Sequence, residues 1–307
     1  MRARLIAAFA AVYVIWGSTY LAIRFAVETL PPLLMAGARF TIAGTILLLF
    51  SRFRSPAQRP TPLDWHTGVV SGLLLLLGGN GGVVWAEQRV PSGIAALLVA
   101  VVPLWIVLLN WMRPRGHRPP LLVFAGLGLG LAGLAFLVGP EALEGRGAID
   151  IAGAGVLILA SLSWAAGSLY TKYAPRPSSG LNGAATQMIA GGGLLVVAAT
   201  LFGELTRLDL AHASSRSILG FFYLVTFGSL IGFTAYVYLL AHTTAAKAAT
   251  YAYVNPVVAV FLGWAFANEG VTSRTLVAAA VILAGVAIIT AARDDDTSAP
   301  VKERAVA

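Results

Sequence analysis

The stretch Trp16-Gly-Ser-Thr-Tyr20, followed by Arg24, decides the architecture of this chain because a related stretch returns about 150 residues later. There, Trp164-Ala-Ala-Gly-Ser168 reaches Lys172 over the same number of positions. A pattern that returns at a fixed distance indicates an internal repeat. The chain therefore reads as two related halves.

Two further pairs of segments support the repeat. Ser92-Gly-Ile-Ala-Ala96 precedes Pro103, and Ala245-Ala-Lys-Ala-Ala249 precedes Pro256 by the same number of steps. Each half closes with an Ala-Gly pair inside an apolar run, at residues 132–133 and 284–285. The matches occur in the same order in both halves, which predicts a duplicated unit.

The composition places this unit in a membrane. Hydrophobic residues make up 58% and charged residues 11% of the chain, whereas soluble domains hold about 25% charge. The absence of cysteine excludes disulfides and Cys-based metal or iron–sulfur sites, and the four His fall in predicted loops or helix ends. We expect no cofactor and no metal. The net charge of +8 is typical of basic cytoplasmic loops, so we expect no nucleic-acid partner.

A membrane-spanning helix needs about 20 mostly apolar residues. The N-terminal run continues past the length of a signal peptide, which predicts a retained first helix. Charged residues, Pro and Gly divide the chain into ten predicted spans, near 5–26, 32–50, 67–86, 91–111, 120–139, 149–171, 182–202, 218–240, 246–267 and 275–292.

Each half then holds five spans, and a second copy of an odd unit enters the membrane in the opposite direction. The predicted fold is an all-α polytopic membrane protein with ten transmembrane helices as two inverted five-helix repeats. The repeats cover 1–140 and 141–293, and a disordered cytoplasmic tail covers 294–307. Fourteen of the 21 Lys and Arg residues fall on one side and five on the other. This asymmetry predicts that both termini are cytoplasmic.

The same segments resemble the EamA-type transporters of the drug/metabolite transporter superfamily. The resemblance rests on Ile15–Arg24, Met35–Phe40, Pro91–Leu97 with Pro103, and Tyr251–Val257, and it spans nearly the whole chain. It implies a ten-helix fold of a bacterial inner-membrane protein that exports or exchanges amino acids, related metabolites or drugs. It also implies a central cavity lined by the first, third, fourth, sixth, eighth and ninth helices.

Polar and aromatic side chains at membrane depth are the candidate substrate-binding residues, because polar groups in hydrocarbon tend to face a cavity or a partner. Asn80 and Glu87 share one face of the third helix, with Glu87 at its outer end, where plain solvation is the alternative. Trp16 and Trp164 correspond across the repeat and lie too centrally to be interfacial anchors, although helix packing would also explain them. The remaining candidates are Gln187, Tyr236, Tyr251 and Asn255.

Arg39 lies on the second helix, too far from its start to be a loop residue. It either attracts an anionic group of a substrate or serves as an internal strut that binds helix-end carbonyls. The strut is the interpretation that the sequence favours.

Pro103 and Pro256 are candidate hinges. A proline inside a helix removes one hydrogen bond and clashes with the carbonyl four residues earlier, here those of Val99 and Ala252. Matching kinks in both halves predict either hinges or fixed bends in the wall of a cavity.

Gly126-x-x-x-Gly130 is a small-residue packing motif in the fifth helix. It marks either a dimer face or a contact inside one bundle, so the chain is expected to be a monomer or a homodimer.

These features predict a secondary transporter whose partners are a small-molecule substrate and the lipid bilayer. Two inverted halves provide alternating access to a central site. A solute channel or a lipid scramblase is the alternative, and an intramembrane enzyme is disfavoured because no metal or nucleophile motif occurs at depth. There is no Walker A loop. Every Asp and Glu lies at or beyond a predicted helix end, so we expect weak or no strict proton coupling.

Overall fold

The computed structural model describes residues 2–90, 95, 98–114, 118–138, 150–175, 177–267 and 272–291. Every regular element in these ranges is a helix. The predicted tail at 294–307 lies outside them. Six helical segments are long and apolar enough to cross a membrane. They are α1 (Arg2–Ala26), α2 (Pro32–Arg54), the continuous α3–η1–α4 (Pro62–Ser71, Gly72–Gly81, Gly82–Ala86), α9 (Ile151–Tyr173), α10 (Gly180–Leu201) and the continuous α11–η3–α12 (Ser215–Tyr223, Leu224–Phe233, Thr234–His242).

The remaining helices are all shorter than these six segments. They are α6 (Val102–Met112), α7 (Leu121–Val138), η2 (Glu204–Arg207), α13 (Ala245–Ala248), α14 (Tyr251–Ala267) and α15 (Ser273–Ala291). The described residues thus confirm an all-helical, multi-pass membrane fold, whereas a count of ten spans stays a prediction.

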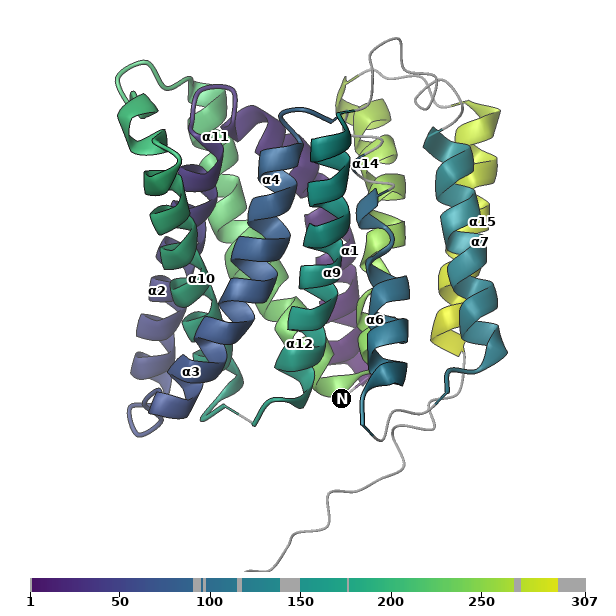
Figure 1. The fold of residues 1–307 in the computed structure, drawn as a ribbon, viewed down its shortest axis with the longest axis horizontal. Helices are drawn as coiled ribbons and strands as arrows, with labels where there is room; N and C mark the ends of the chain where they lie inside the picture. The colour runs from purple at the N-terminus through teal and green to yellow at the C-terminus, as the bar shows by residue number, and fades with distance from the viewer. Residues whose placement is uncertain are drawn as a thin grey trace, which may run out of the picture.

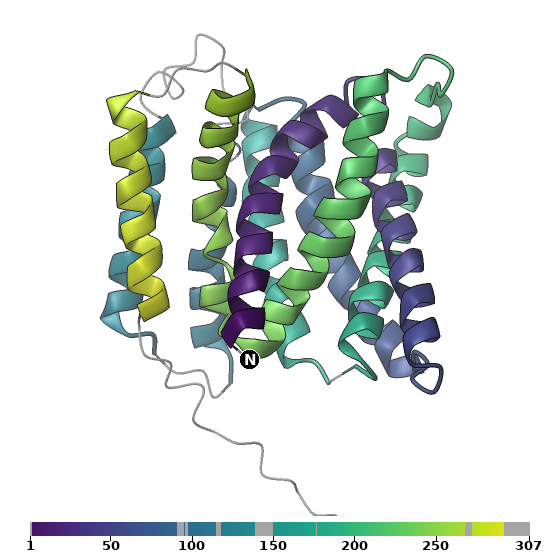
Figure 2. The same ribbon diagram turned by 180° about the vertical axis from the view of Figure 1, so that it is seen from behind.

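Helices from the two halves of the chain lie side by side rather than in separate bundles. α2 of the first half packs along α10 of the second, and α7 packs along α15 at the other end of the molecule (Figures 1 and 2). Glycines let the first pair approach closely: a Cβ on Gly37 would lie 2.9 Å from the backbone nitrogen of Val196. The two halves therefore form one interlocked structure.

The glycines of the predicted packing motif serve the second of these pairs. A Cβ on Gly126 would lie 2.9 Å from the carbonyl oxygen of Gly285, and a Cβ on Gly133 would lie 2.9 Å from Ile282. The repeated Ala-Gly pairs thus pack α7 against α15. Of the two interpretations of the motif, the structure shows the contact inside one bundle.

The first helix of each half crosses over to the other half. α1 packs against η3, α12 and α14, while α9 packs against η1, α4 and α6. Because the exchange is reciprocal, α1 and α9 form the centre of the molecule with walls from both halves around them (Figures 1 and 2).

The third span and the corresponding span of the second half each contain a ten-residue π-helical stretch, η1 and η3. π-Helical turns are rare and frequently mark functional sites. The sequence predicted spans near 67–86 and 218–240, and both are present. They begin earlier, at Pro62 and Ser215, and change their hydrogen-bond pattern midway, which the sequence did not predict.

The candidate hinge prolines lie in different positions relative to their helices. Pro256 lies inside α14, as predicted. Pro103 lies in the first turn of α6, and residues 100–101 before it form a turn. The predicted kink with the Val99 carbonyl is therefore wrong: a proline in the first turn of a helix removes no intrahelical hydrogen bond.

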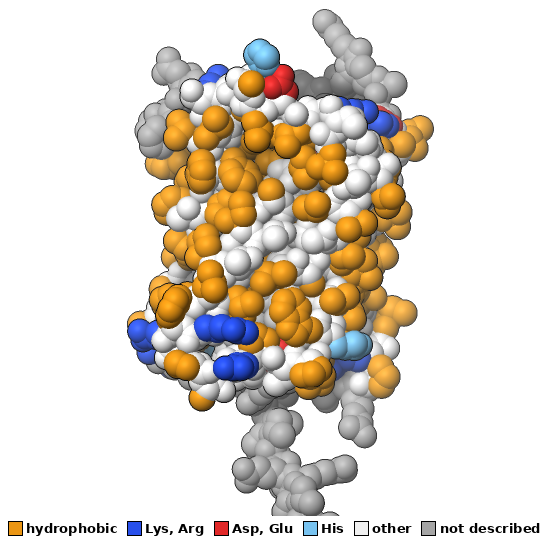
Figure 3. Space-filling view, turned by 90° about the vertical axis from the view of Figure 1, so that its left-hand side faces the viewer, with side chains coloured by type: hydrophobic (Ala, Val, Ile, Leu, Met, Phe, Trp, Pro, Cys, Tyr) orange, Lys and Arg blue, Asp and Glu red, His pale blue; other side chains and the backbone are white. Residues whose placement is uncertain are grey.

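The outer surface fits a lipid environment. Figure 3 shows hydrophobic side chains over most of one face, with basic side chains near its two ends. Large apolar side chains such as Ile46, Leu49 and Val197 are exposed on α2 and α10. A band of this kind needs a hydrocarbon environment, because soluble proteins rarely expose large contiguous apolar patches.

Candidate substrate pocket

One pocket lies at the centre of the molecule, where the two halves meet. Its volume is about 100 Å³, which is of the same order as a roughly 150 Å³ cavity that binds benzene. Its lining comes from α1, α2, η1, α4, α6, α9, η3 and α14, with Val99 and Glu87 beside these helices. The lining includes α2, which the family resemblance did not imply.

Four aromatic rings, from Trp16, Trp164, Tyr236 and Tyr251, form an aromatic cluster at one end of the pocket. The Trp16 ring centroid lies 5.7 Å from that of Trp164 and 4.8 Å from that of Tyr251. Tyr236 is fully buried behind them, and its hydroxyl bonds that of Ser168 at 2.6 Å. Edge-on and tilted contacts of this kind stabilise aromatic groups beyond their burial.

Each of the two tryptophans packs against the π-helical stretch of the other half. The Trp16 indole nitrogen donates to the carbonyl oxygen of Gly228 at 3.1 Å, and a Cβ on Gly232 would lie 2.6 Å from that nitrogen. A Cβ on Gly79 would lie 2.8 Å from the ring of Trp164. Both stretches therefore need glycine where the opposite tryptophan lies.

Arg39 of α2 is the basic group of the pocket. It is 3% exposed, and its Nη2 donates to the side-chain oxygen of Asn80 at 3.0 Å. Its Nε is buried without a hydrogen-bond partner. The predicted strut to helix-end carbonyls is wrong in its partner, which is the Asn80 side chain.

Glu87 follows α4 and lines the same pocket as Arg39. The sequence placed it at a helix end, which is correct, and at that end its partly buried side chain borders the pocket. Its side chain forms no hydrogen bond within the described part of the chain, and the charge of Arg39 attracts it. The expectation that every carboxylate lies at or beyond a helix end therefore holds for Glu87, which nevertheless lines the pocket.

The second half contributes a buried amide to the wall. Asn255 on α14 is 2% exposed, lines the pocket, and has a side-chain oxygen without a hydrogen-bond partner. A buried polar atom without a partner is costly, so a ligand that donates to it gains affinity.

Packed side chains close the pocket toward the end of the molecule where the chain begins; that end is marked N in Figure 2. Beyond the aromatic cluster, Tyr13 and Thr250 bond through their hydroxyls at 2.6 Å, within an apolar layer that includes Val12 and Leu240. Lys172 donates to the carbonyl oxygen of Thr243 at 2.6 Å. In the opposite direction the lining continues along α1 to Ile23, so the pocket extends away from the sealed end.

The structure brings six of the eight predicted binding residues together in the lining: Trp16, Asn80, Glu87, Trp164, Tyr251 and Asn255. Tyr236 lies directly behind them. Gln187 is buried on α10 with its side-chain oxygen unpartnered, and it is not among the lining residues. Sequence reasoning left Arg39 out of the binding set, although a basic residue at membrane depth was the signal that would have included it.

Membrane-length helices around a solute-sized pocket define a multi-pass membrane protein with an internal pocket. A model of the EamA-like transporter family matches residues 3–139 and again 151–291. The chain therefore belongs to the EamA-like transporter family.

Several relatives support this assignment. The chain is 41% identical over 290 residues to the uncharacterized inner membrane transporter YedA of Escherichia coli K12, covering 93% of this chain and 90% of that protein. It is 25% identical over 291 residues to a probable amino-acid metabolite efflux pump of Salmonella typhimurium, covering 90% and 91%. A crystal structure with a TM-score of 0.75 and 21% identity covers 94% of this chain and 97% of its own, and shares the fold.

Proposed function

We propose that this protein is a secondary transporter that exports or exchanges a small amino-acid-like metabolite or drug. The observation that carries the proposal is the pocket between the two halves, with each half supplying a tryptophan to the π-helical stretch of the other. Reciprocal contacts of this kind suit two halves that exchange roles during transport. The printed name of the Salmonella relative supports the substrate class.

In this proposal, ten helices form two inverted repeats, 1–140 and 141–293, in the bacterial inner membrane with both termini in the cytoplasm. The reciprocal pairing of α2 with α10 and of α7 with α15 supports the repeat relation. With the chain's start in the cytoplasm, the sealed end faces inward. The pocket then belongs to an outward-facing state.

Counterflow distinguishes a carrier from a channel or a scramblase. Proteoliposomes preloaded with an unlabelled solute should take up the labelled solute faster than empty ones. The reason is that the binding site of a carrier returns to the outside more readily when it carries internal solute. Flux that ignores the preload would contradict alternating access and support a pore.

Truncation of the pocket wall tests whether this pocket is the site. Cells that express Trp164→Ala should lose most export of the substrate found by mass spectrometry of the medium, because the aromatic cluster loses a ring. Export profiles equal to those of the intact protein would remove Trp164 from the site. The same assay with a pH gradient and Glu87→Gln decides whether proton coupling occurs.

A further inference from the structure

The pocket is lined by one basic and one acidic side chain that do not form an ion pair with each other. Arg39 and Glu87 both line it, and their charges attract. The described residues nevertheless hold no ion pair between the two side chains. The other lining side chains that the structure describes are uncharged.

The Arg39 guanidinium is prepared for a planar anion. Asn80 binds Nη2 and so fixes the orientation of the group, while the buried Nε lacks a partner. A carboxylate typically accepts two parallel N–H bonds from a guanidinium, and such pairs are stronger than neutral hydrogen bonds. A carboxylate would supply the missing partner of Nε.

The charge balance of the pocket restricts the ligand further. In their charged forms Arg39 and Glu87 sum to zero, and an unbalanced buried charge is costly. An anionic or cationic ligand would leave one net charge in the pocket. A ligand that carries both charges leaves none and places each beside its opposite.

The uncharged part of the wall accounts for the remainder of the ligand. The rings of Trp16, Trp164 and Tyr251 border the same space, whose volume suits a small ligand. Asn255 adds an unpartnered acceptor.

We propose that Arg39 and Glu87 are the specificity-determining residues of the pocket and that they select zwitterions. The carboxylate binds Arg39, the ammonium group faces Glu87, and the apolar body contacts the aromatic cluster. This inference rests on the proposed function, because it names the substrate class of the same pocket.

Three probes of nearly equal shape test the inference by thermal stabilisation of the purified full chain in detergent. They are L-valine, its 2-hydroxy analogue, which lacks the positive charge, and L-valinamide, which lacks the negative charge. If another standard amino acid binds better than valine, its hydroxy and amide analogues are used. The intact protein should bind the zwitterion roughly tenfold to a hundredfold more tightly than either analogue, as expected for hydrogen bonds to charged groups.

The two variants should move this preference in opposite directions. Glu87→Gln leaves Arg39 unbalanced, so binding should shift toward the hydroxy acid. Arg39→Gln leaves Glu87 unbalanced, so binding should shift toward the amide. Glu28→Gln makes the same charge change at an exposed residue outside the pocket and should keep the wild-type order. If Arg39→Gln does not fold, Glu87→Gln decides alone.

The inference is overturned if no standard amino acid stabilises the protein, if all three probes bind within twofold, or if Glu87→Gln keeps the preference for the zwitterion over the hydroxy acid. Counterflow without this pattern of charges would sink the inference and leave transport standing. The pattern without counterflow would sink transport alone.

Discussion

The third span of the first half and the corresponding span of the second half share a backbone but differ in what they present to the pocket. Both carry a ten-residue π-helical stretch. At corresponding positions, η1 has Asn80, which binds Arg39, and η3 has Gly232, which makes room for Trp16. The π-helical backbone is repeated, whereas the contact with Arg39 is made by the first copy.

This difference separates two roles of the repeated span: the contact that joins the two halves, and the polar contacts of the pocket. Both copies keep a glycine under the opposite tryptophan, Gly79 for Trp164 and Gly232 for Trp16, and this contact joins the halves. Only the first copy carries the charged groups of the pocket, Arg39 and Glu87. A symmetric mechanism is therefore compatible with an asymmetric binding site.

A methyl group at Gly232 should have the largest effect on this arrangement. In Gly232→Ala the new Cβ would lie 2.6 Å from the Trp16 indole nitrogen, so the ring or η3 must move. Overpacking of this kind costs about 1–3 kcal/mol, and the melting temperature in detergent should fall by several degrees. Gly155→Ala is the matched control, since nothing lies within 4 Å of its new Cβ. Equal melting of the two variants would contradict the close packing of Trp16 on η3.

Replacing each tryptophan by phenylalanine removes its indole hydrogen bond and should have a smaller effect on stability, which differs between the two positions. Trp16→Phe loses a bond to a backbone carbonyl of the other half, at Gly228. Trp164→Phe loses only a 3.3 Å bond to the Tyr236 hydroxyl, which keeps its bond to Ser168. The lost volume is equal, so Trp16→Phe should be less stable by about 1 kcal/mol. The reverse order of melting temperatures would show that Trp164 joins the halves more strongly.

The sequence predicted those features of the two halves that depend on residue composition, namely the spans and several polar residues of the pocket. Apolar runs of membrane length and repeated motifs located the spans. Polar groups in the predicted helices led to Asn80 and Asn255, and the helix face shared with Asn80 led to Glu87. These signals survive folding because a polar group in hydrocarbon needs a cavity or a partner wherever its helix lies.

The structural features that depend on backbone geometry or on the rotation of a helix about its axis could not be predicted from the sequence. A π-helical stretch changes the hydrogen-bond register without changing residue composition, so η1 and η3 left no pattern in the sequence. Whether Arg39 faces a carbonyl or the pocket depends on the rotation of α2, which packing against α10 determines. The turn before Pro103 depends on the neighbouring backbone, and the proline alone does not reveal it.

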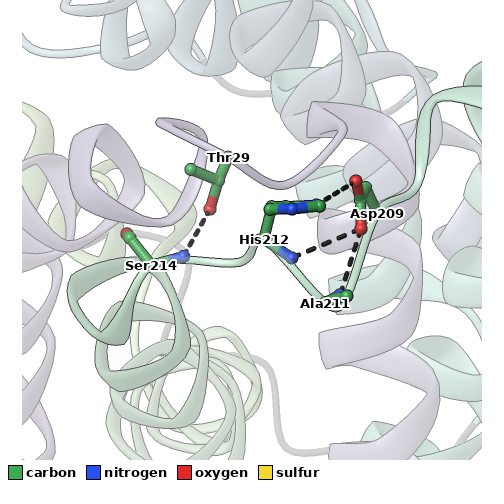
Figure 4. Close-up of polar contacts among 5 residues, drawn as sticks. All are labelled: Thr29, Asp209, Ala211, His212 and Ser214. Carbon is green, nitrogen blue, oxygen red and sulfur yellow. Dashed lines mark hydrogen bonds and ion pairs between the residues drawn. The ribbon is translucent and has the colours of Figure 1, made fainter.

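The connections between the second and third spans provide the last and smallest contrast. In the first half, buried Asp64 accepts from the backbone nitrogen of Ser178 at 2.9 Å. In the second half, exposed Asp209 accepts from the backbone of Ala211 and bonds the His212 ring (Figure 4). The bond with His212 holds the pKa of the Asp209 carboxyl below its ordinary value of 3.8.

Because its folded pKa is lowered, Asp209 stabilises this turn above the ordinary pKa and stops doing so as pH falls through the folded value. Asp209→Ala should therefore speed hydrogen exchange of the amides of Ala211 and His212 at neutral pH, while Asp209→Asn, which keeps an acceptor, should stay closer to the intact protein. Global melting should not change, since the carboxylate lies in water. Exchange that is equal in all three proteins would show that the turn is held instead by the contact between the Ser214 backbone and Thr29, 3.2 Å apart, which joins this connection to the first half.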